Sequence, residues 1–276
     1  MKQRVISALV GLAILFAVLF LYNTIFFNFA VSLVSAVAVF ELLHATGYVK
    51  SRLILVYSLA YALVVPFFST LDIRGMQIWV TVGYFTLMFA TLLAQHEKIR
   101  VEEIAVAFFF SLLVPMALST VVLMRDRFDH GIFYTLLICV AAWVADSAAY
   151  FVGRACGKHK LAPLVSPHKT VEGAVGGVVV SACFFLLFCL GYERVMLYGY
   201  GQQIGIAWLH AFWIGMFCSV MGIFGDLMAS VVKRQAGIKD FGKIMPGHGG
   251  VMDRFDSFLF VAPALYLVLQ VFPIIA

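Results

Sequence analysis

Long apolar segments constrain this chain more than any other feature, because they recur along almost its whole length. A membrane-spanning helix needs about 20 mostly apolar residues. Charged residues make up only 12% of the sequence, against about 25% in a typical soluble domain. We therefore expect an all-α, polytopic helical bundle in the membrane, with about nine transmembrane helices. The apolar segments are residues 5–22, 25–43, 53–70, 77–95, 104–124, 132–152, 173–191, 204–225 and 258–275.

The basic residues predict the orientation of these helices. If the N-terminus is cytoplasmic, four of the 19 Lys and Arg residues lie in outer connections, namely Arg74, Arg125, Arg127 and Arg194. The other 15 lie in cytoplasmic segments, as the positive-inside rule requires. An odd number of helices then places the C-terminus outside. No basic stripe with interleaved aromatic residues occurs in a soluble segment, so we expect no nucleic-acid partner.

The chain has no evident linker, repeat or low-complexity tract, so we expect a single membrane domain over residues 1–276. Residues 1–130 would be mainly scaffold. Residues 131–276, with cytoplasmic loops 153–172 and 226–257, would be the catalytic half. The first apolar segment lacks a small-x-small cleavage site, which predicts an uncleaved helix. The five cysteines form no CxxC pair and predict neither disulfides nor a zinc site.

Acidic and basic residues gather in the second of these loops. Asp226 closes a long apolar helix, where a carboxylate is costly unless it is paired or binds a metal. Lys233 follows about two helical turns later, and Asp253 and Asp256 have the i, i+3 spacing that places them on one helical face. Three carboxylates beside cations predict a Mg²⁺ site that faces phosphate. Alternatively, Asp253 caps the last helix, and Lys233 with Arg234 only fixes topology.

A glycine-rich stretch, residues 246–250, lies between these charged groups. Three glycines in five residues allow the backbone to approach a ligand and turn its N–H groups toward an anion. A flexible turn is the alternative interpretation. His248 would act as an acid or base, or as a simple hydrogen-bond donor.

The first loop ends in a run of polar residues before the next apolar segment. Ser166 or Thr170 would cap that helix, with Glu172 supplying the reciprocal hydrogen bond. The same hydroxyls and Lys169 would instead bind phosphate at the helix N-terminus. Both interpretations stay open.

Asp146 lies inside an apolar segment, and a buried acid in a membrane segment is a functional candidate. Its partner is expected to be a cation from one of the two loops. Glu41 and His44 are weaker candidates, because they lie near a helix end that water should reach.

The polar residues of the second loop have a distinctive spacing. They read Ser230-x-x-Lys233-Arg234-x4-Lys239-Asp240-x5-Pro246-x-His248-Gly249-Gly250-x-x-Asp253-Arg254-x-Asp256. This run resembles the signature of the phosphatidate cytidylyltransferase (CDP-diacylglycerol synthase) family. Asp146 to Tyr150, Ser166 to Thr170 and Gly225 to Leu227 are similar to the family too, so the resemblance extends over residues 143–257.

The resemblance implies a reaction, a cofactor and an assembly. CTP and phosphatidate would give CDP-diacylglycerol and pyrophosphate, with Mg²⁺ and with a second metal ion left open. It also implies a homodimer, contact with membrane lipid, and a bacterial inner-membrane protein with a cytoplasmic active site.

The resemblance further implies roles for individual residues. Asp226 and Asp253 would bind the metal, with Asp256 at or beside it, and Lys233 and Arg234 would contact phosphates. The substrate-binding residues would be Asp146, Ser166, Lys169, Thr170, Ser230, Lys239, His248, Gly249, Gly250 and Arg254.

This chain departs from the family pattern in a few places. Ala229 stands where members commonly carry Glu, Met245 where Leu, Ile or Phe is usual, and Val171 where Trp is frequent. Ala229 bears on the surroundings of the metal.

Other functions remain as alternatives. A transporter would use Asp146 and Asp226 as an ion path, but that leaves the glycine-rich stretch and the clustered cations unexplained. A nucleotidyltransferase acting on another lipid phosphate is a closer alternative. A phosphotransferase that consumes CDP-lipids would need a different Asp-rich motif.

Overall fold

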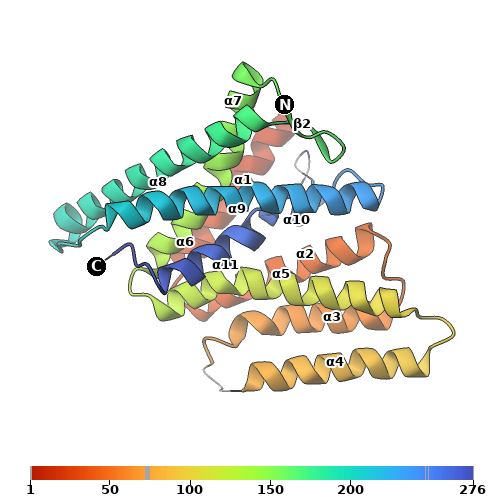
Figure 1. Ribbon diagram of the computed structural model, residues 1–276. Coiled ribbons are helices and arrows are strands. Elements are labelled where there is room, and N and C mark those ends of the chain that lie inside the picture. The colour runs from red at the N-terminus through yellow and green to blue at the C-terminus, as the bar shows by residue number, and fades with distance from the viewer. Residues whose placement is uncertain (1, 72–74, 246, 248, 276) are drawn as a thin grey trace. The chain divides into compact units, whose positions relative to one another are not determined.

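The computed structural model describes the chain except for residues 1, 72–74, 246, 248 and 276, and except for the side chains of residues 2–8. Helices dominate the described part (Figure 1). They are α1 (Lys2–Phe20), α2 (Ile25–Ala45), α3 (Arg52–Val64), α4 (Met76–Ala94), α5 (Val101–Arg127), α6 (Gly131–Cys139), α7 (Ala145–Cys156), α8 (Val171–Tyr200), α9 (Trp208–Gln235), α10 (Met252–Phe255) and α11 (Phe258–Leu269). A 3₁₀ turn, η1 (Val65–Phe67), extends α3, and a π-helical segment, η2 (Val140–Val144), joins α6 to α7.

Six of these helical segments are long and apolar enough to cross a membrane: α2, α4, α5, the continuous run Gly131–Cys156, α8 and α9. The expectation of an all-α membrane protein is confirmed at this level. Each of the nine predicted segments contains a helix, but a count of nine crossings stays a prediction. The α-helix in the segment predicted at 53–70 is shorter than expected, because Pro66 has no N–H to donate to the preceding turn; α3 ends at Val64 and continues as the 3₁₀ turn η1.

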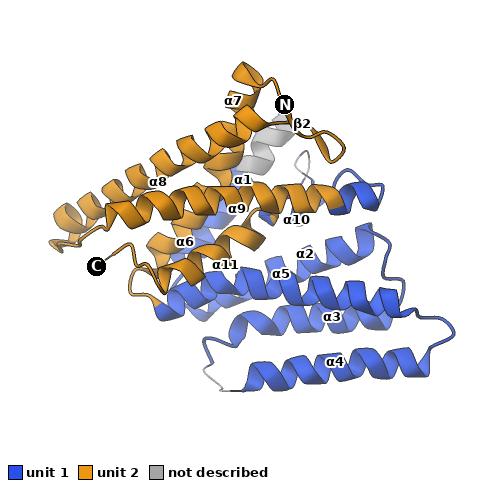
Figure 2. Cartoon of the chain, in the orientation of Figure 1, with its two compact units in different colours: residues 1–127, 232–255 blue, residues 128–231, 256–276 orange. Residues whose placement is uncertain are grey.

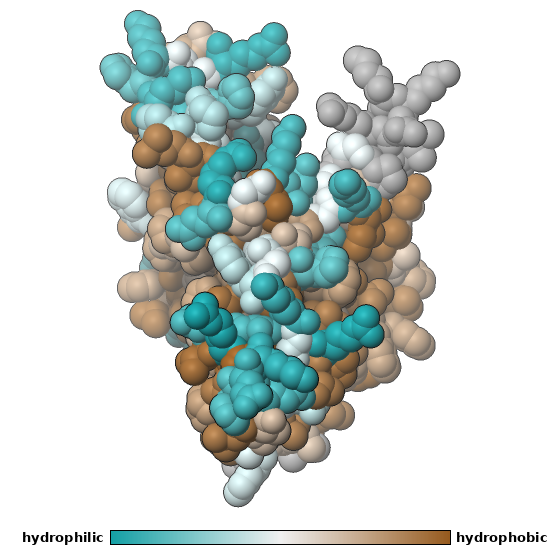
Figure 3. Space-filling view, turned by 90° about the vertical axis from the view of Figure 1, so that its right-hand side faces the viewer, coloured by the Kyte–Doolittle hydropathy of each residue, from teal (hydrophilic) through white to brown (hydrophobic). Residues whose placement is uncertain are grey.

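Large apolar side chains are widely exposed, as a membrane protein requires. Trp79 and Leu93 on α4 are 77% and 76% exposed, and Phe151 on α7 is 67% exposed. Figure 3 shows hydrophobic side chains over broad areas of one face, with hydrophilic side chains gathered in clusters. Apolar patches of this extent mark contact with lipid or protein rather than with water.

The chain divides into two compact units, each made of two stretches of sequence (Figure 2). The first unit is residues 1–127 and 232–255, and the second is residues 128–231 and 256–276. In the first unit, the Tyr84 hydroxyl on α4 forms hydrogen bonds with Ser58 on α3 (3.0 Å) and Ser111 on α5 (2.6 Å). Such hydroxyl contacts hold helices together where lipid gives no hydrophobic driving force between them.

In the second unit, small residues let α7 and α8 pack with their backbones almost in contact. A Cβ added to Gly173 would lie 2.6 Å from the carbonyl oxygen of Ala149, and one added to Gly177 would lie 2.8 Å from that of Ala145. Gly153, one turn beyond Ala149, faces the start of α8. This is the small-xxx-small pattern of close helix crossings in membranes, and it fixes the start of α8 beside α7.

A two-stranded antiparallel hairpin precedes α8, and the sequence reading did not predict it. Strands β1 (Lys160–Ala162) and β2 (Ser166–Thr170) pair with Lys160 opposite Thr170 and Ala162 opposite Ser166. The segment is short and polar and has too little hydrophobic alternation to predict a strand. The hairpin places Lys169 and Thr170 directly at the N-terminus of α8.

Candidate functional site

The second unit brings together Asp226 and Lys169, which the sequence placed in separate loops. The Lys169 Nζ forms an ion pair with Asp226 Oδ2, and each side chain is 24% exposed. The expectation that Asp226 closes its helix is wrong: Asp226 lies on α9, nine residues before its end at Gln235, so residues 226–235 belong to the helix rather than to the loop. Lys169 therefore supplies a partner for a carboxylate that is costly on an apolar helix unless it is paired or binds a metal. A carboxylate has about four lone-pair sites, so Asp226 keeps capacity for a cation.

Thr170 holds the helix N-terminus beside this ion pair. Its Oγ1 accepts a hydrogen bond from the Gly173 N–H at 3.1 Å, which makes Thr170 the cap of α8. Ser166 does not cap the helix, because it begins strand β2 four residues earlier. The expected reciprocal bond from Glu172 is also wrong. Glu172 accepts instead from the backbone N–H groups of Lys158 and His159 and from the His159 ring, which ties the start of the hairpin to α8.

Asp146 lies in the first turn of α7, directly after the π-helical segment η2. The Ser257 hydroxyl donates to its Oδ2 at 3.2 Å. A π-segment inserts one extra residue per turn and changes which way the following side chains point, and such segments are frequent at functional sites. The predicted pairing of Asp146 with a loop cation stays a prediction.

Asp256 is buried in the second unit, and its backbone lies against Gly225, the residue before Asp226. A Cβ added to Gly225 would lie 2.7 Å from the carbonyl oxygen of Asp256. Asp256 itself is 8% exposed, and its Oδ1 accepts the Ser257 N–H at 2.8 Å. Gly225 therefore allows α9 to approach the chain at Asp256 and Ser257, the residue that also contacts Asp146.

In the first unit, Asp253 is the centre of a second charged cluster. The Lys233 ammonium donates to its Oδ1 at 2.9 Å, and the N–H groups of Phe241 and Gly250 donate to its Oδ2 at 2.9 and 3.0 Å. The Lys233 ammonium also lies 5.3 Å from the centre of the Phe241 ring. Asp253 lies in the first turn of α10, but these contacts reach beyond that helix, so it organises the loop as well.

The glycine-rich stretch has the backbone conformation that favours glycine at two positions. Gly247 and Gly249 have φ values of 78° and 85°, which L residues rarely adopt. Gly249 also lies against Asp253, whose Oδ2 would be 2.9 Å from an added Cβ. His248 and Pro246 lie outside the described residues.

Four other predicted substrate or phosphate-binding residues lie on α9, in the loop after it and on α10. Arg234, Lys239 and Arg254 are exposed, as phosphate-binding cations at a membrane surface would be, and Ser230 is half-buried. Ala229, which stands where family members commonly carry Glu, is buried, with a side chain that is 5% exposed.

The burial of Glu41 was not predicted from the sequence. Its side chain is 3% exposed, so the expectation that water reaches it is wrong. The Met252 N–H donates to its Oε2 at 2.8 Å. A glutamate near the end of an apolar helix gives no sign in the sequence that a loop 211 residues later will cover it.

The carboxylates can be tested for their fit to Mg²⁺, which prefers oxygen ligands and usually binds one or two carboxylates plus substrate phosphates. Asp226 fits, because it is partly exposed and has unused lone pairs. Asp253 has less capacity for a metal ion, because its carboxylate already accepts three hydrogen bonds. Among the described residues, no three His, Cys, Asp or Glu side chains are grouped to hold a metal ion. A shared site for Asp226, Asp253 and Asp256 stays a prediction.

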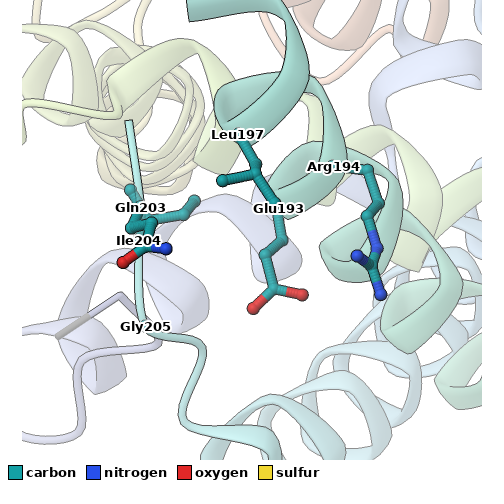
Figure 4. Close-up of a pocket in the computed structure, with 6 residues that line it drawn as sticks. All are labelled: Glu193, Arg194, Leu197, Gln203, Ile204 and Gly205. Atoms are coloured by element: carbon teal, nitrogen blue, oxygen red, sulfur yellow. The ribbon is translucent and has the colours of Figure 1, made fainter. Parts of the chain in front are cut away.

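A cavity of about 430 Å³ lies at the other end of α8 (Figure 4). Its lining residues are Glu193, Arg194, Leu197, Gln203, Ile204 and Gly205. At ~1.5 Å per residue, Glu193 is ~35 Å along the helix from the capped end at Thr170. The cavity is therefore remote from Lys169 and Thr170 at the start of α8.

The fold and these clusters define a polytopic α-helical membrane protein with paired acidic and basic side chains on its helices and loops. A model of the cytidylyltransferase family matches residues 2–272. The chain belongs to this family.

Relatives that align over the full length of the chain have one name in common. The phosphatidate cytidylyltransferase of Bacillus subtilis (strain 168) is 34% identical over 281 residues, which cover 99% of this chain and 98% of the relative. That of Staphylococcus haemolyticus (strain JCSC1435) is 32% identical over 98% of this chain and 99% of the relative. A third, from Staphylococcus saprophyticus, is 44% identical over 141 residues, about half of each chain.

Proposed function

We propose that this protein is a membrane-bound phosphatidate cytidylyltransferase that converts CTP and phosphatidate to CDP-diacylglycerol and pyrophosphate in phospholipid biosynthesis. The observation that carries the proposal is the match of almost the whole chain both to the cytidylyltransferase family and to relatives bearing that name. The transporter alternative is not favoured, because the same match covers both polar loops.

The chemistry needs charge neutralisation more than proton transfer. A phosphate monoester such as phosphatidate has a second pKa of about 6 and is largely ionised at neutral pH. One of its oxygens attacks the α-phosphorus of CTP, and the bond from that phosphorus to the β-phosphate oxygen breaks, so pyrophosphate leaves. Because both reactants are polyanions, catalysis depends on cations that hold the attacking and leaving oxygens in line.

We assign phosphate binding to the loop cations and the glycine-rich stretch. Lys169 and Thr170 lie at the N-terminus of α8, where helix N–H groups favour anions. The predicted phosphate contacts of Lys233 and Arg234 fit their place at the end of α9. The proposed substrate contacts also include Asp146, Ser166, Ser230, Lys239, His248, Gly249, Gly250 and Arg254.

We assign Mg²⁺ binding to the three carboxylates. Asp226 is the best candidate ligand, because it is partly exposed and has unused lone pairs. Bound Mg²⁺ would neutralise charge on the triphosphate. Asp253 and Asp256 keep their predicted roles as ligands, and the Ser257 hydroxyl, which donates to Asp146, would hold the segment that carries Asp256.

The topology that accompanies this function has nine crossings, a cytoplasmic N-terminus and an active site at the cytoplasmic side of a bacterial inner membrane. CTP would arrive from the cytosol while the acyl chains of phosphatidate stay in the lipid. The homodimer implied by the family resemblance is part of the same proposal.

The proposal is tested by pyrophosphate release from CTP by the purified protein in detergent or vesicles. Release should require both phosphatidate and Mg²⁺, and CDP-diacylglycerol should form in equal amount. An isoprenoid ether lipid phosphate tests the substrate class. Release with that lipid, but none with phosphatidate, would contradict the proposed substrate.

A further inference from the structure

Glu41 on α2 is buried in the first unit with its carboxylate against the loop that carries the predicted active-site residues. Its side chain is 3% exposed, and a buried carboxylate is costly unless nearby groups compensate it. Oε2 accepts the Met252 N–H at 2.8 Å. Oε1 has no hydrogen-bond partner among the described residues. An apolar side chain would pack in the same place without that cost, so packing alone does not explain a glutamate here.

The Glu41 carboxylate leaves no room for a side chain at two positions of the loop, Gly242 and Gly250. A Cβ added to Gly242 or to Gly250 would lie 2.6 Å from Cδ of Glu41, well inside van der Waals contact. Neither glycine has a positive φ, so the backbone would accept alanine at both positions. The space taken by Glu41, rather than backbone conformation, therefore excludes a side chain at Gly242 and Gly250.

Asp253 holds the loop at the same two places, near residues 241–242 and at residue 250, by accepting backbone N–H groups. Asp253 accepts the N–H groups of Phe241 and Gly250, while Glu41 contacts Gly242, Gly250 and the Met252 N–H. The loop is therefore fixed between two carboxylates, and one of them also binds Lys233.

We propose that Glu41 is a positioning residue of the active site, which fixes the loop through Gly242, Gly250 and Met252 so that Asp253 and Lys233 are held for substrate. The inference rests on the proposed function, because it assigns that loop to substrate binding. Glu41 itself contacts loop backbone and has no role in the chemical step.

A double-mutant cycle between Glu41 and Gly250 tests the contact. Gly250→Ala and Glu41→Ala should each lower kcat by about tenfold or more, because small displacements of catalytic groups are costly. In the double variant the added methyl occupies the space that Glu41 leaves, so kcat should fall no further than in the worse single variant. If the two losses multiply, the proposal is overturned.

Gly237→Ala is the matched control in the same unit. Its φ of 68° makes alanine strained whatever stands at position 41, and a methyl there meets neither Glu41 nor Asp253, so any loss it causes should multiply with that of Glu41→Ala. The conservative Glu41→Gln keeps both the shape and an oxygen for the Met252 N–H. It should retain most of kcat, whereas a loss equal to that of Glu41→Ala would contradict positioning by shape and hydrogen bonding.

Trypsin cleavage gives a readout that does not need turnover. Lys239 and Lys243 are exposed in the loop, and Glu41→Ala should speed cleavage after them several-fold in folded protein, while Glu41→Gln should not. Unchanged cleavage in Glu41→Ala would count against positioning. If the wild-type protein turns over no CTP with phosphatidate, the proposed function fails while this assay still tests the role of Glu41.

Discussion

Asp226→Asn separates the catalytic role of Asp226 from its structural role. The substitution keeps the shape of the side chain but removes the charge that faces Lys169. Breaking a fully buried ion pair costs about 3–5 kcal/mol, whereas an exposed pair contributes about 0–1 kcal/mol. Because a quarter of each side chain is exposed, we expect a loss of about 1–2 kcal/mol in the free energy of unfolding.

The expected loss of activity is larger than this loss of stability. Removing one charge-stabilising group from an active site typically costs ~10²–10³ in kcat, or about 2.7–4 kcal/mol. Pyrophosphate release measured at saturating CTP and phosphatidate, over a titration of Mg²⁺, gives kcat and the metal dependence together. We expect Asp226→Asn to insert and fold, to lose at least about 100-fold in kcat, and to recover little at high Mg²⁺.

Glu102→Gln is the control for this variant. Glu102 is an exposed carboxylate on α5, outside the signature residues, and its substitution should leave kcat within about twofold, as expected of a surface change. Size-exclusion chromatography in detergent distinguishes a folded, inactive enzyme from a misfolded one. If folded Asp226→Asn keeps more than half of the wild-type kcat, Asp226 does not bind the catalytic metal.

Three further predictions concern the hairpin and the crossing of α7 and α8. Lys169→Ala should raise the KM for CTP more than the KM for phosphatidate, and an unchanged CTP dependence would leave Lys169 only its ion pair with Asp226. Thr170→Val should lower the free energy of unfolding by about 1 kcal/mol through loss of the helix cap, seen as a lower thermal midpoint. Gly177→Ala should destabilise by about 1–3 kcal/mol, since its methyl would overlap the backbone of α7. Gly191→Ala on the same helix meets open space and should be neutral or slightly stabilising, so equal effects of the two glycine substitutions would contradict the close crossing.

The sequence alone determined the features that depend on near neighbours in the chain. Hydrophobicity summed over about 20 residues predicts membrane helices whatever their packing, and the charged, glycine-rich loop signature predicted the family. Thr170 was among the predicted caps because a cap acts within three residues. Asp226 was expected to be paired or metal-bound because it directly follows a long apolar segment.

The tertiary structure decided which distant residues meet. The sequence did not show that Lys169 pairs with Asp226, since that contact joins strand β2 to α9, which are far apart in the chain. It gave the wrong environment for Glu41, because burial there comes from a loop 211 residues away. Local signals measure the free energy of a residue among its neighbours in the chain. Which carboxylate is covered, and by which N–H groups, depends on how the helices and loops pack once the chain has folded.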